Sequence, residues 1–184
     1  MIFRRVAMFL VALSATTLRS AEHSSDPAFS FQDVKYFYRW SHNQQYEFTP
    51  AKQEDLDHWS DMITINGYPS VEDGEKLAAA ANTVLGNYQS SEGKILKTSS
   101  VPAKEERPAE HFIAVFFTRP DFCEAAFARF KLADGKGYSF VYSHRFYGEE
   151  AKDRLTAWLK ANGDKVEKSL MDWDPNLEPW PANS

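Results

Sequence analysis

The chain has 184 residues, and its 26 acidic side chains against 21 lysines and arginines give a net charge of −5 at pH 7. This acidic excess argues against nucleic acid and anionic membrane surfaces as partners, because both attract faces rich in lysine and arginine. The length suits one domain with its own core, which the aromatic content of 15% helps to fill. The single cysteine, Cys123, excludes an internal disulfide, so packing must stabilise the fold.

Residues 1–21 have the layout of a secretory signal peptide. Arg4 and Arg5 form a positively charged start, Val6–Leu13 is an apolar stretch, and small residues lead up to Ala21. The apolar stretch is shorter than the ~18 residues that a membrane-spanning helix requires. We therefore expect the segment to be removed, with no membrane anchoring afterwards, and the mature protein to be periplasmic or secreted.

The segments that flank the predicted domain are polar or rich in proline. Residues 22–33 are expected to form a flexible leader, with Phe29 and Phe31 as docking points. Residues 34–173 are expected to form a single domain, and residues 174–184, with three prolines, a loose tail. The chain shows no internal repeat and no linker between domains, and we expect a monomer.

The first part of the domain is dense in β-forming residues. Val34–Trp40 and Gln45–Thr49 are separated by a polar turn, and this pattern predicts a hairpin. Asp61–Asn66 predicts a third strand.

The most regular pattern in the chain predicts a helix between Ser70 and Gly93. Ser70 is a candidate N-cap, Asp73 is the acid of a capping box, and Gly93 marks the stop. Apolar residues recur between them at helical spacing: Leu77, Ala81, Val84, Leu85 and Tyr88.

A run of strands follows this helix. Lys94–Val101 is a candidate strand, and His111–Thr118, Phe122–Leu132 and Tyr138–Tyr147 are strong ones. The links between the last three are short, so these strands form an antiparallel meander. Several are apolar on both faces, and both faces of the sheet must therefore be covered.

A long helix and a short one are predicted at the end of the domain. Ala151, Leu155 and Trp158 form the apolar stripe of the long helix, and Asn162-Gly163 closes it, before a short helix that carries Val166 and Leu170. The fold class predicted from this order is α+β, with a central antiparallel sheet and helices packed on both faces.

The element order also resembles a known fold. An aromatic hairpin that closes on Phe48-Thr-Pro50 and a following Ile63-Thr-Ile65 strand, within residues 34–162, resemble the PsbP-like α/β/α sandwich. Its namesake is an exported subunit of the photosynthetic oxygen-evolving complex, so the resemblance implies a non-enzymatic binding or assembly module, with no functional residue carried over. Three parts also look like an uncharacterised bacterial exported protein family: Phe48–Ile65, Ser139–Tyr147 and the helix before Gly163.

Charged side chains within strands that otherwise read as core are the main candidates for ligand contact. A charged group in such a position must be paired or open to a pocket. Arg145 is the best single candidate, and His144 points to the opposite face of the same strand. Together with Glu124, Arg129 and Glu110, these residues predict either a polar pocket or ion pairs at the strand edges.

A second candidate is the acidic cluster formed by Asp55, Asp57, His58 and Asp61 around Trp59. If this segment forms a helical turn, Asp57 and Asp61 lie on one face and could bind a divalent cation or a basic partner side chain. A solvated acidic turn is the alternative. No two histidines have the spacing of metal ligands on a helix, and neither a metal nor a cofactor is predicted.

These features predict a binding or assembly module for a protein or small-molecule ligand. No catalytic residue is assigned, because no Gly-x-Ser-x-Gly turn occurs and Cys123 lies in an apolar stretch without a partner. One alternative is a small periplasmic hydrolase that uses His58, His111 or His144 with nearby carboxylates. The other is an acidic inhibitor or immunity-type protein that blocks a basic enzyme.

Overall fold

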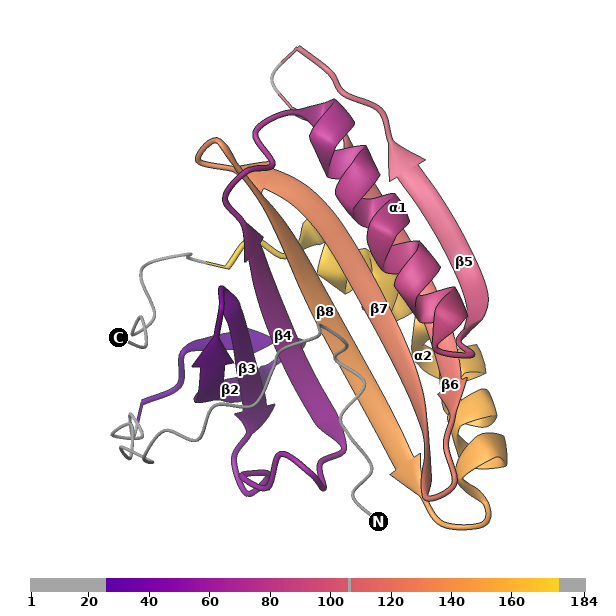
Figure 1. Cartoon of the computed structure of the whole chain (residues 1–184). Helices are drawn as coiled ribbons and strands as arrows, with labels where there is room; N and C mark the ends of the chain where they lie inside the picture. The colour runs from indigo at the N-terminus through magenta and orange to yellow at the C-terminus, as the bar shows by residue number, and fades with distance from the viewer. Residues whose placement is uncertain (1–25, 106, 176–184) are drawn as a thin grey trace, which may run out of the picture.

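The computed structural model describes residues 26–105 and 107–175, and within them one sheet of eight strands is flanked by two α-helices (Figure 1). The predicted signal peptide and the tail from residue 176 onward lie outside the described residues. Among the residues that are described, neither helix has the length and apolar character needed to cross a membrane.

The sheet runs in the order β1-β2-β3-β4-β8-β7-β6-β5, and each neighbouring pair of strands is antiparallel. The predicted meander forms its centre. The strands are β1 (Phe29–Phe31), β2 (Val34–His42), β3 (Gln45–Pro50), β4 (Asp61–Tyr68), β5 (Lys94–Val101), β6 (Glu110–Thr118), β7 (Phe122–Ala133) and β8 (Lys136–Tyr147). The helices are α1 (Gly74–Ser90) and α2 (Ala151–Asp172).

Two-residue turns set the register of two hairpins. Asn43 and Gln44 join β2 to β3 with φ of 47° and 65°, and Asp134 and Gly135 join β7 to β8 with φ of 49° and 71°. Two consecutive positive φ angles match the right-handed twist of the flanking strands, and asparagine, aspartate and glycine tolerate them best.

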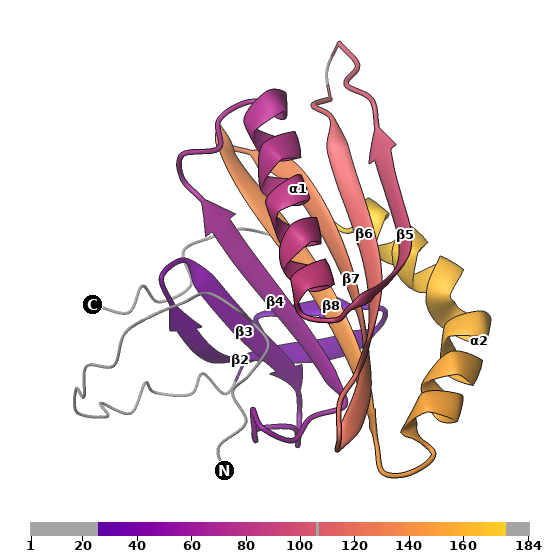
Figure 2. The same cartoon turned by 45° about the vertical axis from the view of Figure 1, so that its right-hand side comes forward.

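The two helices cover opposite faces of the sheet (Figures 1 and 2). Ile113 of β6 packs in a cluster with Leu77 of α1, whereas its neighbour Phe112 packs in the cluster that holds Leu155 and Leu170 of α2. Adjacent strand residues point to opposite faces, so the meander strands are apolar on both sides. The predicted α+β class with helices on both faces is confirmed.

Both helix boundaries differ from those predicted. The N-cap of α1 is Asp73 rather than Ser70, since the Asp73 carboxylate accepts a hydrogen bond from the Lys76 amide at 2.8 Å. The second helix continues through Gly163 instead of ending there. Val166 and Leu170, which follow this glycine, are buried against the sheet, and this packing outweighs the ~1 kcal/mol that a glycine costs a helix.

The prediction of a flexible leader over residues 22–33 is wrong for Phe29–Phe31, which form β1 and pair with β2. Phe31 is only 3% exposed, and its ring lies 5.3 Å from that of Trp173. Packing of the buried Phe31 against the partly buried Trp173, from opposite ends of the domain, keeps the segment on the sheet.

Candidate functional site

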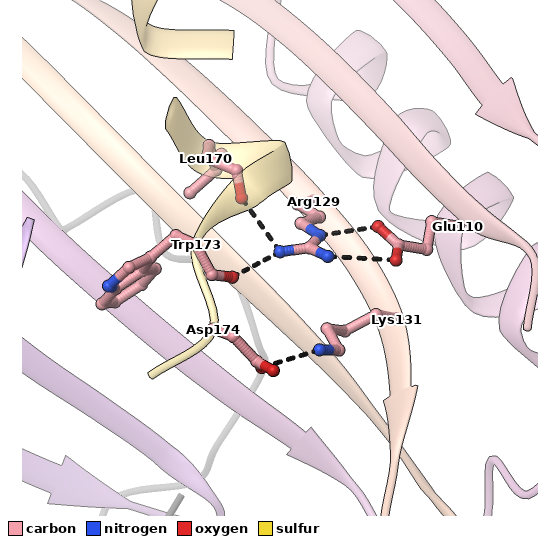
Figure 3. Close-up of polar contacts among 6 residues, drawn as sticks. All are labelled: Glu110, Arg129, Lys131, Leu170, Trp173 and Asp174. Carbon is pink, nitrogen blue, oxygen red and sulfur yellow. Dashed lines mark hydrogen bonds and ion pairs between the residues drawn. The ribbon is translucent and has the colours of Figure 1, made fainter. Parts of the chain in front are cut away.

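A buried ion pair lies on the α2 face of the sheet. Arg129 of β7 and Glu110 of β6 bond twice, at 2.7 Å (Nε to Oε2) and 3.0 Å (Nη2 to Oε1), as Figure 3 shows. Arg129 is 5% exposed and Glu110 is 6% exposed. Two parallel bonds between a guanidinium and a carboxylate fix both orientation and distance.

The same guanidinium also holds the end of α2. Nη1 of Arg129 donates to the backbone oxygens of Leu170 at 3.1 Å and Trp173 at 2.5 Å (Figure 3). The last carbonyls of a helix have no partner within the helix, and a cation is favourable there because the helix dipole is negative at that end. Arg129 therefore joins two strands and one helix at a single point.

Arg129 and Glu110 line a pocket of about 420 Å³ and, as the two buried residues of its lining, form its floor. At its rim the Nζ of Lys131 donates to Asp174 at 2.8 Å, and this hydrogen bond holds the pKa of Asp174 below its usual value. The lining combines charged and apolar side chains: Arg107, Pro108, Glu110, Arg129, Lys131, Leu132, Met171, Asp172 and Asp174.

Glu110 and Arg129 are thus the two predicted site residues that the structure brings together in a pocket. Lys131 was missed, although it stands two residues after Arg129 in the same strand and so points to the same face. No sequence pattern indicates that Asp174 and Met171 line the pocket, because their positions depend on where α2 ends.

Arg145, the best single candidate from sequence, lies elsewhere. It pairs with Glu124 at 2.8 Å on the neighbouring strand, and its guanidinium lies 3.8 Å from the ring centre of Trp59 and 4.1 Å from that of Phe122. The ion pair and two cation–π contacts satisfy this charge within the protein. Neither Arg145 nor Glu124 lines the pocket.

His144 belongs to a third polar group. Its Nδ1 lies 2.8 Å from Oδ1 of Asp61, which also accepts a hydrogen bond from Tyr142 at 2.7 Å. Its ring stacks on Trp158, with the ring centres 4.1 Å apart. Burial raises the pKa of Asp61, but the hydrogen bond and charge of His144 and the Tyr142 hydroxyl outweigh it, so this pKa lies below its usual value.

The acidic cluster predicted around Trp59 is divided in the structure. Asp61 points to His144, whereas Asp55, Asp57 and His58 are exposed in the loop before β4. The loop contains no helix, although the His58 amide donates to the Asp55 carbonyl at 3.2 Å and closes a single turn. The Asp55 carboxylate also accepts a hydrogen bond from the Asp57 amide at 2.9 Å, a local bond that competes with helix formation.

The two other histidines considered for a hydrolytic site, His58 and His111, do not form a joint site. His58 stacks on Tyr147, and His111 bonds through Nδ1 to the Ser100 hydroxyl at 2.8 Å. Burial lowers the pKa of His111. Within the described part of the chain, no three histidine, cysteine or acidic side chains converge as metal ligands would.

The fold and site define an α+β sandwich with a charged pocket at the end of its second helix. Residues 24–174 match one family model, and the chain belongs to that uncharacterised family. No curated protein matches the chain. Among solved structures it is similar to the Ran-binding protein Mog1p of Saccharomyces cerevisiae, with a TM-score of 0.48 and 9% identity over 73% of this chain and 78% of that one. A likeness at this level carries no argument about function.

Proposed function

We propose that this protein is a non-enzymatic binding module that takes a small polar molecule into the pocket at the end of α2. The observation that supports this most directly is the buried Arg129–Glu110 pair at the floor of the pocket. A volume of about 420 Å³ lies within the usual range for small-molecule sites.

The floor of the pocket is held in a fixed geometry. Because Arg129 is held by Glu110 and by the end of α2, the polar groups of the pocket are already ordered before a ligand arrives. A preordered site loses less entropy when it binds. Pro108, Leu132 and Met171 add apolar surface beside these charges, the mixture that small-molecule pockets generally have.

A protein-observed NMR titration with neutral, cationic and anionic fragments tests this proposal. We expect fragments to shift the amide signals of Leu132 and Met171. Leu132→Trp should fill the pocket and abolish these shifts, while Leu96→Trp, on the exposed strand β5, should leave them unchanged. Fragments that bind only at other surfaces, or that bind Leu132→Trp equally well, would overturn the proposal.

The place of action is a separate part of the proposal. We infer from the signal-like residues 1–21 that the mature protein works in the periplasm or outside the cell, as the PsbP-like resemblance also implies. N-terminal sequencing of the protein recovered from the periplasm or medium should find a start near residue 22. A cytoplasmic product that retains Met1 would contradict export.

A hydrolase remains a second candidate because Asp61 and His144 lie within hydrogen-bond distance. A carboxylate on Nδ1 leaves Nε2 to move a proton, as in catalytic dyads. This Nε2 is buried, and among the described residues no hydrogen-bond partner is found for it. Hydrolysis of p-nitrophenyl acetate by the wild type and by His42→Gln, but not by His144→Gln, would support this candidate; equal rates in all three would remove it.

A further inference from the structure

We propose that Asp174 occupies an anion subsite at Lys131 in the absence of a ligand, and that the ligand of the pocket is a small organic anion that displaces it. This inference rests on the proposed binding function and names the chemistry of its ligand. The geometry that carries it is the contact of 2.8 Å between Lys131 Nζ and Asp174 Oδ1, which Figure 3 shows. Both residues line the pocket.

The two partners of this contact differ in how firmly they are held. The Lys131 side chain is 15% exposed and comes from the central strand β7, whereas the Asp174 side chain is 78% exposed and follows the end of α2. The contact itself is exposed, so a ligand anion can reach the Lys131 ammonium without any opening of the fold. An exposed carboxylate regains its hydration when it moves away, so Asp174 is the partner that can be exchanged.

The other acidic side chains of the pocket are less suited to exchange. Glu110 is buried and bonds twice to Arg129. Asp172 is also exposed, but its lysine partner, Lys168, does not line the pocket. Asp174 therefore occupies the position that a ligand anion would take.

The charge balance of the lining sets the charge of the ligand. Glu110 neutralises Arg129, and Lys168, outside the lining, neutralises Asp172. Displacement of Asp174 therefore leaves the positive charges of Lys131 and Arg107 to be matched by an anionic group of the ligand. Arg107, also on the rim, supplies further hydrogen-bond donors for a carboxylate or phosphate.

The apolar part of the lining indicates that the ligand also has an apolar body. Pro108, Leu132 and Met171 offer a surface that an inorganic anion would not use. A carboxylate or phosphate monoester with an apolar body matches both halves of the pocket. Benzoate and phenyl phosphate are probes for the two anionic groups, and benzamide is the neutral counterpart of benzoate.

NMR titration of the full-length chain with these probes tests the inference. Exposed ion pairs contribute about 0.2–1 kcal/mol, so removal of the competing carboxylate in Asp174→Asn should tighten benzoate binding by a factor of about 1.4 to 5. Lys131→Met should weaken it at least about tenfold. Asp153→Asn, at the opposite end of α2, should bind benzoate as the wild type does, and benzamide should bind at least about tenfold more weakly than benzoate.

The outcomes separate this inference from the proposed function. If Asp174→Asn binds benzoate no more tightly than the wild type, the claim that Asp174 competes with the ligand for Lys131 is refuted. If benzamide or a cationic fragment binds as tightly as benzoate and phenyl phosphate, the assignment of an anionic ligand is refuted. In both cases binding in the pocket stands. The proposed function itself fails only if no fragment of any charge reaches the pocket.

Discussion

Replacement of Arg129 by methionine should be among the most destabilising single changes in the domain. The substitution keeps much of the apolar stem but removes the guanidinium that bonds to Glu110 and to the end of α2. Glu110, 6% exposed, then remains as a buried carboxylate without its cation. Removal of one partner from a buried ion pair costs about 3–5 kcal/mol, so we expect a loss of about 4 kcal/mol in the free energy of unfolding.

The double variant Glu110→Met/Arg129→Met should be more stable than Arg129→Met alone. It removes the uncompensated charge and leaves only the carbonyls of Leu170 and Trp173 without their donor. An unmade hydrogen bond costs about 1 kcal/mol, so the double variant should lose about 2 kcal/mol. The expected ordering follows from desolvation of the charge rather than from the number of bonds removed.

Urea unfolding at pH 7, followed by tryptophan fluorescence, measures these differences. With a slope of about 2 kcal/mol per molar urea, Arg129→Met should lower the midpoint by about 2 M and the double variant by about 1 M. Arg107→Met, an exposed arginine of the same pocket, is the matched control and should change stability by less than about 0.5 kcal/mol. A loss below about 1 kcal/mol for Arg129→Met, or a double variant less stable than it, would refute this reasoning.

Three further changes test other parts of the fold. Gly93→Ala should cost about 1–3 kcal/mol in thermal unfolding, because its Cβ would lie 2.7 Å from the backbone oxygen of Tyr88; an unchanged melting temperature would contradict this. Asp73→Ala should cost about 1 kcal/mol through loss of the N-cap, and helix content by circular dichroism that melts as in the wild type would argue against it. Asp61 has a lowered pKa beside His144, so its carboxylate contributes stability above the unfolded pKa near 4, and this contribution falls as the pH drops through the folded pKa. The difference in stability between wild type and Asp61→Asn should therefore shrink in acid, and a constant difference from pH 6 to pH 2 would contradict the assignment.

Much of the architecture follows from local patterns. The helical spacing of apolar residues, the alternation in the strands and the short links predict the meander and the cover on both faces, because each pattern involves neighbours in sequence. Charged residues in apolar strands likewise mark Glu110, Arg129, Glu124 and Arg145 as groups that need partners. Packing decided the helix boundaries instead, as at Gly163, where a buried stripe continues the helix past a residue that usually ends one.

By itself, the sequence determined that charges such as Arg129 and Arg145 would need partners, but not which residues these partners would be. Arg129 bonds to Glu110 from 19 residues away, and Asp61 meets His144 from 83 residues away. Only strand register and sheet order place such groups on one face. The pocket depends on a further tertiary fact, the point at which α2 ends over the sheet, since its last carbonyls and Asp174 complete a site that β6 and β7 only begin.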